Sequence, residues 1–152
     1  DDGHQIITPP SGNTNGKSSS VSPGSNFLHG FTNWYIGSSP SPGDLWKEDG
    51  TGVNNPCPSG YRLPTETEWN TERTSWSTSD AAGAFASPLK LTIAGNRVDG
   101  TGSFDNVGTA GVYWSSTVDS GTFSRYLALL ASNASVSGLH RTYGFSVRCL
   151  KD

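Results

Sequence analysis

The sequence predicts an α+β domain in which two helices pack on small antiparallel sheets joined by long Gly/Ser-rich loops. Three observations predict this class. A clear helix start lies in the middle of the chain, and apolar runs typical of strands follow it. The composition, with 19 glycines, 9 prolines and 32% hydrophobic residues, suits short elements and many turns. The 152 residues accommodate one domain, expected over residues 26–152 after an N-terminal extension or linker over residues 1–25.

The first helix is expected in the segment LPTETEWNTERTSW. Thr65 and Glu68 have the spacing of a capping box, in which the Thr65 hydroxyl caps the Glu68 amide and the Glu68 carboxylate reaches back. Helical spacing then places Trp69, Arg73 and Trp76 on one side, where both tryptophans can pack inward.

A shorter helix is expected in DAAGAFAS, capped by Ser79 or Asp80 and ended by Pro88. The segment LKLTIAG, residues 89–95, follows as a strand. The next segment, NRVDGTGSFDNVGTAG, is rich in glycine and polar residues and is expected to form a loop.

Three further segments combine apolar, aromatic and β-branched residues and are predicted as strands: residues 111–118, 124–132 and 143–150. They form an antiparallel meander that returns the C-terminus to the sheet. Short strands separated by loops are also expected over residues 26–56, where aromatic residues alternate with turn formers.

Charge and hydropathy exclude two classes of partner. The net charge is -3 and no run of like charges occurs, whereas nucleic acid and anionic membranes attract a basic stripe. No apolar stretch approaches the roughly 20 residues that a membrane-spanning helix needs. We therefore expect neither nucleic-acid binding nor membrane insertion.

The two cysteines, Cys57 and Cys149, favour a disulfide. Without clustered histidines they cannot complete a tetrahedral zinc site, although two buried free thiols are the alternative. A disulfide indicates an oxidising location, the periplasm or the cell exterior.

Residues 1–25 are polar and contain just two adjacent large apolar residues, Ile6 and Ile7. This composition is typical of a linker or tail. Alternatively, residues 5–8 pair as a strand with this domain or with a neighbouring copy, so that residues 1–20 support self-assembly. Because the chain starts at Asp1, we expect either a removed signal peptide or a fragment of a longer protein.

The segments NPCPSGYRLPTETEW, YWSSTV, SRYL and YGFSVRCLKD, in this order, resemble the Fibrobacter succinogenes major paralogous domain family over roughly residues 26–152. Such domains occur in secreted and surface proteins of Bacteroidetes and their relatives. The RLPTETEW segment is also similar to a helix of formylglycine-generating enzymes. The resemblance implies a C-type-lectin-like fold, with a disulfide that links Cys57 at the start of the first helix to Cys149 in the final strand.

The same resemblance argues against catalysis. Formylglycine-generating enzymes use a pair of active-site cysteines that hold copper, and the only partner available to Cys149 is Cys57. No G-x-S-x-G elbow is present, and the helix explains its early glutamates through the helix dipole. The histidines are scattered along the chain: His4, His29 and His140. We expect no enzyme.

Calcium is the one candidate cofactor. The loop motifs through which C-type lectins hold calcium and sugar are absent, but the Gly-rich loop offers oxygen ligands from Asp99, Asp105 and Asn106. Plain turn formation is the alternative interpretation of these residues.

A ligand-binding surface is expected near the C-terminus, where the loops of this fold class meet partners. The residues there that combine hydroxyls, charge and one aromatic ring suit an adaptable contact surface. They are Asp119, Ser120, Thr122, Phe123, Asn133, Ser135, His140 and Arg141. A solvated turn is the alternative for each. A second set is expected to hold the fold: Trp114, Ser115, Ser116, Arg125, Tyr126, Gly144, Phe145 and Arg148.

These observations favour a secreted ligand-binding or adhesion module at a bacterial surface, which recognises a glycan or a protein. The alternative is a structural subunit of an extracellular fibre or surface layer, assembled through the N-terminal segment.

Overall fold

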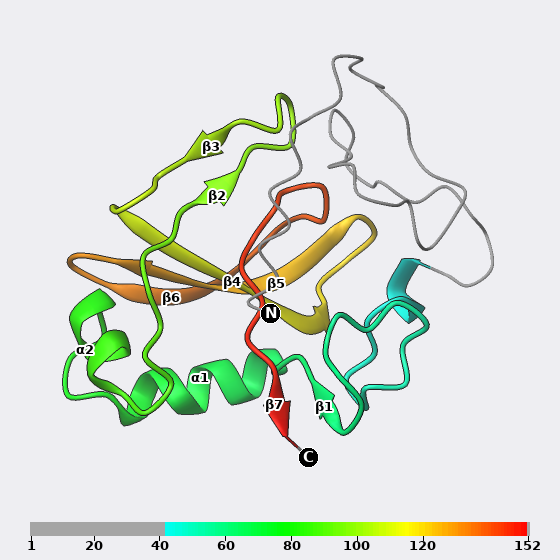
Figure 1. Ribbon diagram of the computed structural model, residues 1–152, viewed down its shortest axis with the longest axis horizontal. Coiled ribbons are helices and arrows are strands. Elements are labelled where there is room, and N and C mark those ends of the chain that lie inside the picture. The colour runs from blue at the N-terminus through cyan, green and yellow to red at the C-terminus, as the bar shows by residue number, and fades with distance from the viewer. Residues whose placement is uncertain (1–41, 152) are drawn as a thin grey trace.

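A computed structural model describes residues 42–151 of the chain. Its main element is a three-stranded antiparallel sheet in the order β4-β5-β6 (Figure 1). The strands are β4 (Ala110–Val118), β5 (Phe123–Leu130) and β6 (Ala134–His140). The meander predicted from the sequence is therefore confirmed in β4 and β5. The expectations for residues 1–25, for assembly through residues 1–20 and for strands before residue 42 lie outside the described part of the chain.

Strand β6 is an element that sequence reasoning missed. It pairs with β5 along its whole length, with Leu127 opposite Val136 and Leu129 opposite Ala134. Its apolar residues alternate with Ser135 and other small polar residues, which is the period of a half-buried strand. The serines and the glycine hide this pattern in the sequence, because they are typical of loops.

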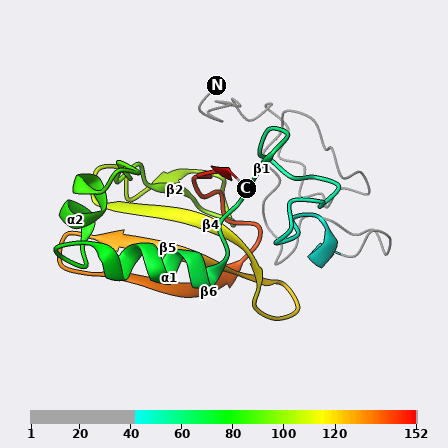
Figure 2. The same cartoon turned by 90° about the horizontal axis from the view of Figure 1, so that it is seen from below.

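Helix α1 (Glu66–Ser75) lies across one face of this sheet (Figure 2). Trp69 on this helix is 1% exposed and contacts Tyr113 of β4, with ring centroids 6.1 Å apart. Its indole Nε1 donates a hydrogen bond to the carbonyl of Trp114 at 3.2 Å. The core cluster around it consists of Trp69, Ala84, Leu91, Tyr113, Leu127, Leu129 and Ala134.

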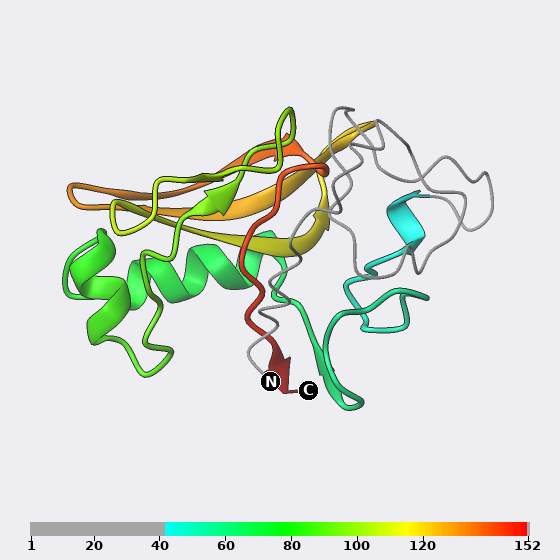
Figure 3. The same ribbon diagram turned by 45° about the horizontal axis from the view of Figure 1, so that its top comes forward.

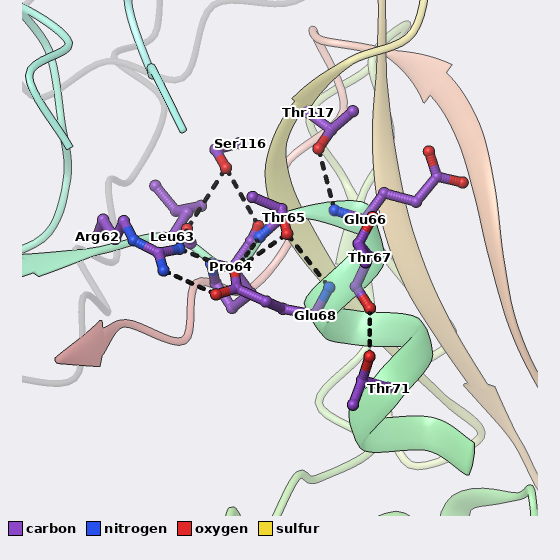
Figure 4. Close-up of polar contacts among 10 residues, drawn as sticks. All are labelled: Arg62, Leu63, Pro64, Thr65, Glu66, Thr67, Glu68, Thr71, Ser116 and Thr117. Carbon is purple, nitrogen blue, oxygen red and sulfur yellow. Dashed lines mark hydrogen bonds and ion pairs between the residues drawn. The ribbon is translucent and has the colours of Figure 1, made fainter. Parts of the chain in front are cut away.

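The capping box predicted at the start of α1 is present (Figure 4). The Thr65 hydroxyl accepts from the Glu68 amide at 3.2 Å, and the Glu68 carboxylate accepts from the Thr65 amide at 2.8 Å. Arg62 adds two bonds to the same carboxylate, at 2.8 and 2.7 Å. Mainly because of these bonds from Arg62, the pKa of Glu68 falls from 4.5 to about 2.

Helix α2 (Ala81–Ala86) also begins where the sequence predicts. The Asp80 side chain accepts from the Gly83 amide at 2.8 Å and caps the helix. A Cβ on Gly83 would lie 1.9 Å from the Thr78 carbonyl oxygen, so only glycine fits this close approach. Neither helix within residues 42–151 is long and apolar enough to cross a membrane.

The disulfide between Cys57 and Cys149 is formed, with Cα atoms 5.7 Å apart. Beside it, β1 (Tyr61–Arg62) pairs antiparallel with β7 (Leu150–Lys151). The expectation that the C-terminus joins the main sheet as a strand over residues 143–150 is wrong. This segment hydrogen-bonds in turn to Arg97, to the free edge of β4 and to β1, so no continuous ladder forms (Figure 3).

Two other expectations for strands are also wrong. Residues 89–95 form no strand, because the Tyr113 hydroxyl bonds both the amide and the carbonyl of Thr92, at 2.8 and 2.9 Å. Residues 42–56 contain only a short 3-10 helix, η1 (Pro42–Asp44). Conversely, the expected loop after Gly95 contains a small ladder of β2 (Asn96–Arg97) with β3 (Phe104–Asp105).

Acid should weaken this fold through Glu68. Because the pKa of this carboxyl is lowered on folding, its contribution to the free energy of unfolding is present above about pH 4.5 and is lost as the pH falls toward about 2. Glu68→Gln should lower stability at neutral pH and flatten the pH dependence in that window, as measured by urea unfolding. Glu72→Gln is the matched control, since the amide keeps an oxygen for Trp76 Nε1. Identical pH profiles for Glu68→Gln and wild type would contradict the assignment.

Candidate functional site

The structure brings most of the predicted ligand-binding residues to one end of the sheet. Residues 119–122 form the turn between β4 and β5, and Phe123 begins β5. His140 ends β6 opposite Phe123, and Arg141 follows it. We call these residues together the hairpin end. Asn133 and Ser135 pair with the opposite end of β5, whose eight residues span roughly 25 Å, and so are not part of this group.

A tight turn shapes the hairpin end. The Phe123 amide donates to the Ser120 carbonyl at 2.7 Å, and Gly121 between them has a φ of 43°, a left-handed conformation that favours glycine. The turn leaves Asp119 and Ser120 exposed and Thr122 and Phe123 partly buried. Small polar groups are therefore presented around one aromatic ring.

The rings of Phe123 and His140 form a pair at this end. The two residues are opposite each other in the β5–β6 ladder, and their ring centroids are 4.2 Å apart. The Thr122 hydroxyl lies 3.3 Å from His140 Nδ1. Both rings are partly exposed, so the pair offers an aromatic surface together with groups that donate and accept hydrogen bonds.

An ion-pair network lies beside these rings, on the face that α1 covers. Arg125 Nη2 donates to Glu66 Oε1 at 2.5 Å, and Arg125 Nη1 lies 3.8 Å from Asp119 Oδ1. The bond to Glu66 raises the pKa of Arg125 above its ordinary value. Asp119 thus has a structural partner, although its side chain is exposed, and Glu66 is partly buried.

Thr117 connects this network to the chain before β1. Its hydroxyl accepts from the Glu66 amide at 3.0 Å (Figure 4) and donates to Glu48 Oε1 at 2.5 Å. The start of α1 is therefore bonded to β4 by a side chain, which fixes Glu66 opposite Arg125.

The opposite face of the sheet has a small pocket at the same end, with a volume of about 40 Å³. Its walls include Leu45, Trp46, Trp114, Ser124 and Arg141. Trp46 and Ser124 were not among the predicted site residues. The sequence favours Trp46 as a core or loop anchor over a ligand platform, and it does not show that the segment around Trp46 approaches the sheet.

Arg141 is the only charged side chain among the described lining residues of this pocket. Its Nε donates to the Ser124 hydroxyl at 2.9 Å, and its Nη2 donates to the Phe123 carbonyl at 3.2 Å. Its Nη1 is buried, and no acceptor within residues 42–151 reaches it. Burial lowers the pKa of this guanidinium.

An aromatic cluster adjoins the pocket. The Phe145 ring stacks on Trp114 with centroids 4.3 Å apart and lies 4.9 Å from Tyr126 and 5.8 Å from Tyr143. Trp114 is buried and the other three rings are partly buried. The expectation that Trp114, Tyr126 and Phe145 hold the fold is consistent with these contacts.

The other residues that were expected to hold the fold differ in their burial and in their contacts. The Ser115 hydroxyl donates to the Arg125 carbonyl at 2.9 Å and so links β4 to β5. The Ser116 hydroxyl donates to the Pro64 carbonyl at 3.3 Å and so links β4 to the segment just before α1. Gly144 pairs with Arg97. Arg148, by contrast, is exposed.

The three calcium candidates, Asp99, Asp105 and Asn106, interact with neighbouring groups in the structure. Asn106 donates its backbone and side-chain N–H groups to the two carboxylate oxygens of Asp105, both at 2.9 Å, while Asp99 interacts with the Tyr143 hydroxyl. Calcium requires six or more oxygen ligands around one point. In the part of the chain that the structure describes, no group of three His, Cys, Asp or Glu side chains could hold a metal ion.

No family model, curated protein or solved structure matches this chain.

The two carboxylates beside Arg125 should contribute unequally to stability. Glu66→Gln removes the charge at 2.5 Å and should lower the free energy of unfolding by about 1 kcal/mol, whereas Asp119→Asn should lower it by less than about 0.5 kcal/mol. Urea unfolding of both variants, alone and combined with Arg125→Gln, would measure each coupling. A larger loss from Asp119→Asn than from Glu66→Gln would contradict the geometry.

Proposed function

We propose that this chain is a secreted ligand-binding or adhesion module of a bacterial surface, with a C-type-lectin-like fold, and that the hairpin end is its contact surface. The observation that carries the proposal is the convergence of Thr122, Phe123, His140 and Arg141 at one end of the sheet. These residues come from two separate segments of the chain. None of them belongs to the core cluster around Trp69.

A rigid support favours binding at this position. Residues 123 and 140 are paired within a hydrogen-bonded ladder, and the Arg141 amide donates to the Thr122 carbonyl at 3.1 Å. Side chains held by strands lose less conformational entropy on binding than side chains on a free loop. The hairpin end is therefore preorganised although a turn forms part of it.

The chemistry of the surface favours a polar, hydrated ligand. It presents partly exposed rings, hydroxyls and charges of both signs, which is the composition of wet and adaptable interfaces. Glycans fit such a surface, because their C–H faces pack on aromatic rings and their hydroxyls exchange hydrogen bonds with polar side chains. The disulfide supports the extracellular assignment, since such bonds persist in oxidising compartments.

The family assignment rests on sequence motifs. The segments around Cys57, Trp69, Trp114 and Cys149 resemble the Fibrobacter succinogenes major paralogous domain family, whose members occur in secreted and surface proteins. The α+β arrangement of two helices and small antiparallel sheets is compatible with the fold that this resemblance implies.

Loss of both rings should abolish recognition. We expect an array of glycans and host surface proteins to yield a ligand whose affinity falls at least about tenfold in Phe123→Ala/His140→Ala, because truncating central aromatic anchors removes most of the binding energy. Asn133→Ala, at the opposite end of β5, is the matched control and should bind as wild type does.

Two results would contradict the proposal. One is an array on which the folded protein binds nothing above background. The other is a ligand whose binding survives the loss of both rings and is lost in Asn133→Ala, which would place the surface at the other end of the sheet.

A further inference from the structure

A groove with a volume of about 290 Å³ lies beside helix α1, and none of its lining residues belongs to the hairpin end. Two partly buried leucines line it from other segments of the chain: Leu89, which follows α2, and Leu150 of β7. The residues that α1 contributes lie three or four positions apart, so they form one stripe on the helix surface. The polar members of this stripe are Glu68, Thr71, Glu72 and Ser75.

Glu72 has no counter-ion in the described part of the chain. Glu68 is held by two bonds from Arg62, whereas no cationic side chain within residues 42–151 lies within 4.0 Å of the Glu72 carboxylate. Glu72 is also partly buried and lies in the last turn of α1, where the helix dipole disfavours negative charge. A cation bound beside Glu72 would offset both costs.

One oxygen of this carboxylate is available to a ligand. Oε1 accepts from Trp76 Nε1 at 2.9 Å, whereas Oε2 has no donor within the described residues. Oε2 does not belong to the side-chain atoms that are buried without a partner, so a ligand can reach it. Lys90, beside Leu89 in sequence, directs its ammonium elsewhere: it donates to the Ala86 carbonyl at 3.4 Å and lies over the Phe85 ring.

The two hydroxyls of the stripe also present acceptors. The Thr71 hydroxyl donates its hydrogen to the Thr67 carbonyl at 2.9 Å, and the Ser75 hydroxyl donates to the Glu72 carbonyl at 2.7 Å. Both residues are exposed, so their oxygens can accept from a ligand. Together with Glu72 Oε2 they make three acceptors and no free donor. An alkylammonium has three donors and no acceptor, whereas a sugar hydroxyl or an amide also needs a donor.

An ammonium suits this wall better than a guanidinium. A guanidinium favours both oxygens of one carboxylate, and Trp76 already uses Oε1. An ammonium is a compact charge that one oxygen can pair, and its alkyl stem can pack along Leu89 and Leu150. The volume of the groove lies near the lower bound of about 300 Å³ for small-ligand sites, which fits one long side chain.

We infer that this groove binds a lysine side chain of a protein partner. The ammonium bonds Glu72, Thr71 and Ser75, and the methylenes lie along Leu89 and Leu150. The site is separate from the hairpin end and goes beyond the proposed function, because it adds a second point of contact that selects lysine.

An NMR titration of the isotope-labelled chain with a blocked pentapeptide, in which one lysine stands between alanines, tests the inference. The backbone amide signals of Thr71, Glu72 and Ser75 should shift, with a Kd below about 5 mM. The same peptide with acetyl-lysine keeps the methylenes and loses the charge, so it should bind at least about tenfold more weakly. An arginine peptide should also bind more weakly than the lysine peptide.

Glu72→Gln should weaken binding of the lysine peptide about tenfold. This variant keeps an oxygen for Trp76 Nε1, so its melting temperature should not fall. Ser75→Ala removes a different acceptor and should weaken binding by a smaller factor. Glu48→Gln is the matched control, because it makes the same change at an exposed carboxylate outside the groove and keeps an oxygen for Thr117. It should bind as wild type does.

Four results would overturn the inference: no shift along α1 at millimolar peptide, equal affinities for the lysine and acetyl-lysine peptides, equal losses in Glu72→Gln and Glu48→Gln, or tighter binding of the arginine peptide. Loss of lysine binding in Phe123→Ala/His140→Ala would place the peptide at the hairpin end and also overturn it. Glycan binding that needs those two rings, in a chain that binds no lysine peptide, would refute the groove and leave the proposed function standing.

Discussion

The disulfide between Cys57 and Cys149 is the constraint on which the arrangement of both faces depends. It joins residues 92 positions apart, and closing such a loop stabilises a fold by about 4 to 5 kcal/mol in the chain-entropy model. The bond holds the segment before β1 next to β7. The chain between Arg141 and Cys149 must then run along the free edge of β4, where Ser146 exchanges hydrogen bonds with Val112 and Trp114 at 3.0 Å.

This path explains why the two faces of the sheet differ. Helix α1 covers one face of the sheet with Trp69. Phe145, in the segment between Arg141 and Cys149, stacks on Trp114 and covers the other face. Arg141 stands where this segment leaves β6, so its guanidinium lies at the edge of the aromatic cluster. Arg141 itself is held by its neighbours in the sheet, since its amide donates to the Thr122 carbonyl at 3.1 Å and its guanidinium bonds Ser124 and Phe123.

Local chemistry made part of the fold predictable. The Thr65 and Glu68 capping box, the Asp80 cap and the apolar runs of β4 and β5 depend on residues close in sequence, and all are present. Elements that depend on distant partners were not predictable. In residues 89–95, Thr92 bonds to the Tyr113 hydroxyl and no strand ladder forms. Residues 143–150 bond in turn to Arg97, β4 and β1 and form no single strand.

The candidate site follows the same division. Sequence reasoning selected Phe123, His140, Arg141 and Asn133 alike from their chemistry. Because β6 was not recognised, it could not show that Asn133 lies at the far end of the sheet from the other three. Trp46 was missed for a similar reason, since its approach to the sheet is a tertiary contact. The types of side chain thus indicated the kind of surface, whereas the pairing of the strands determines which of these residues lie close together.

Amide hydrogen exchange after selective reduction of the disulfide tests the central claim most directly. If the bond holds the segment after Arg141 on the sheet, the amides of Ser146 and Trp114 should lose protection, while those of Tyr126 and Ser137 in the β5–β6 ladder keep most of theirs. Unchanged protection at Ser146, or an equal loss at all four amides, would contradict the account.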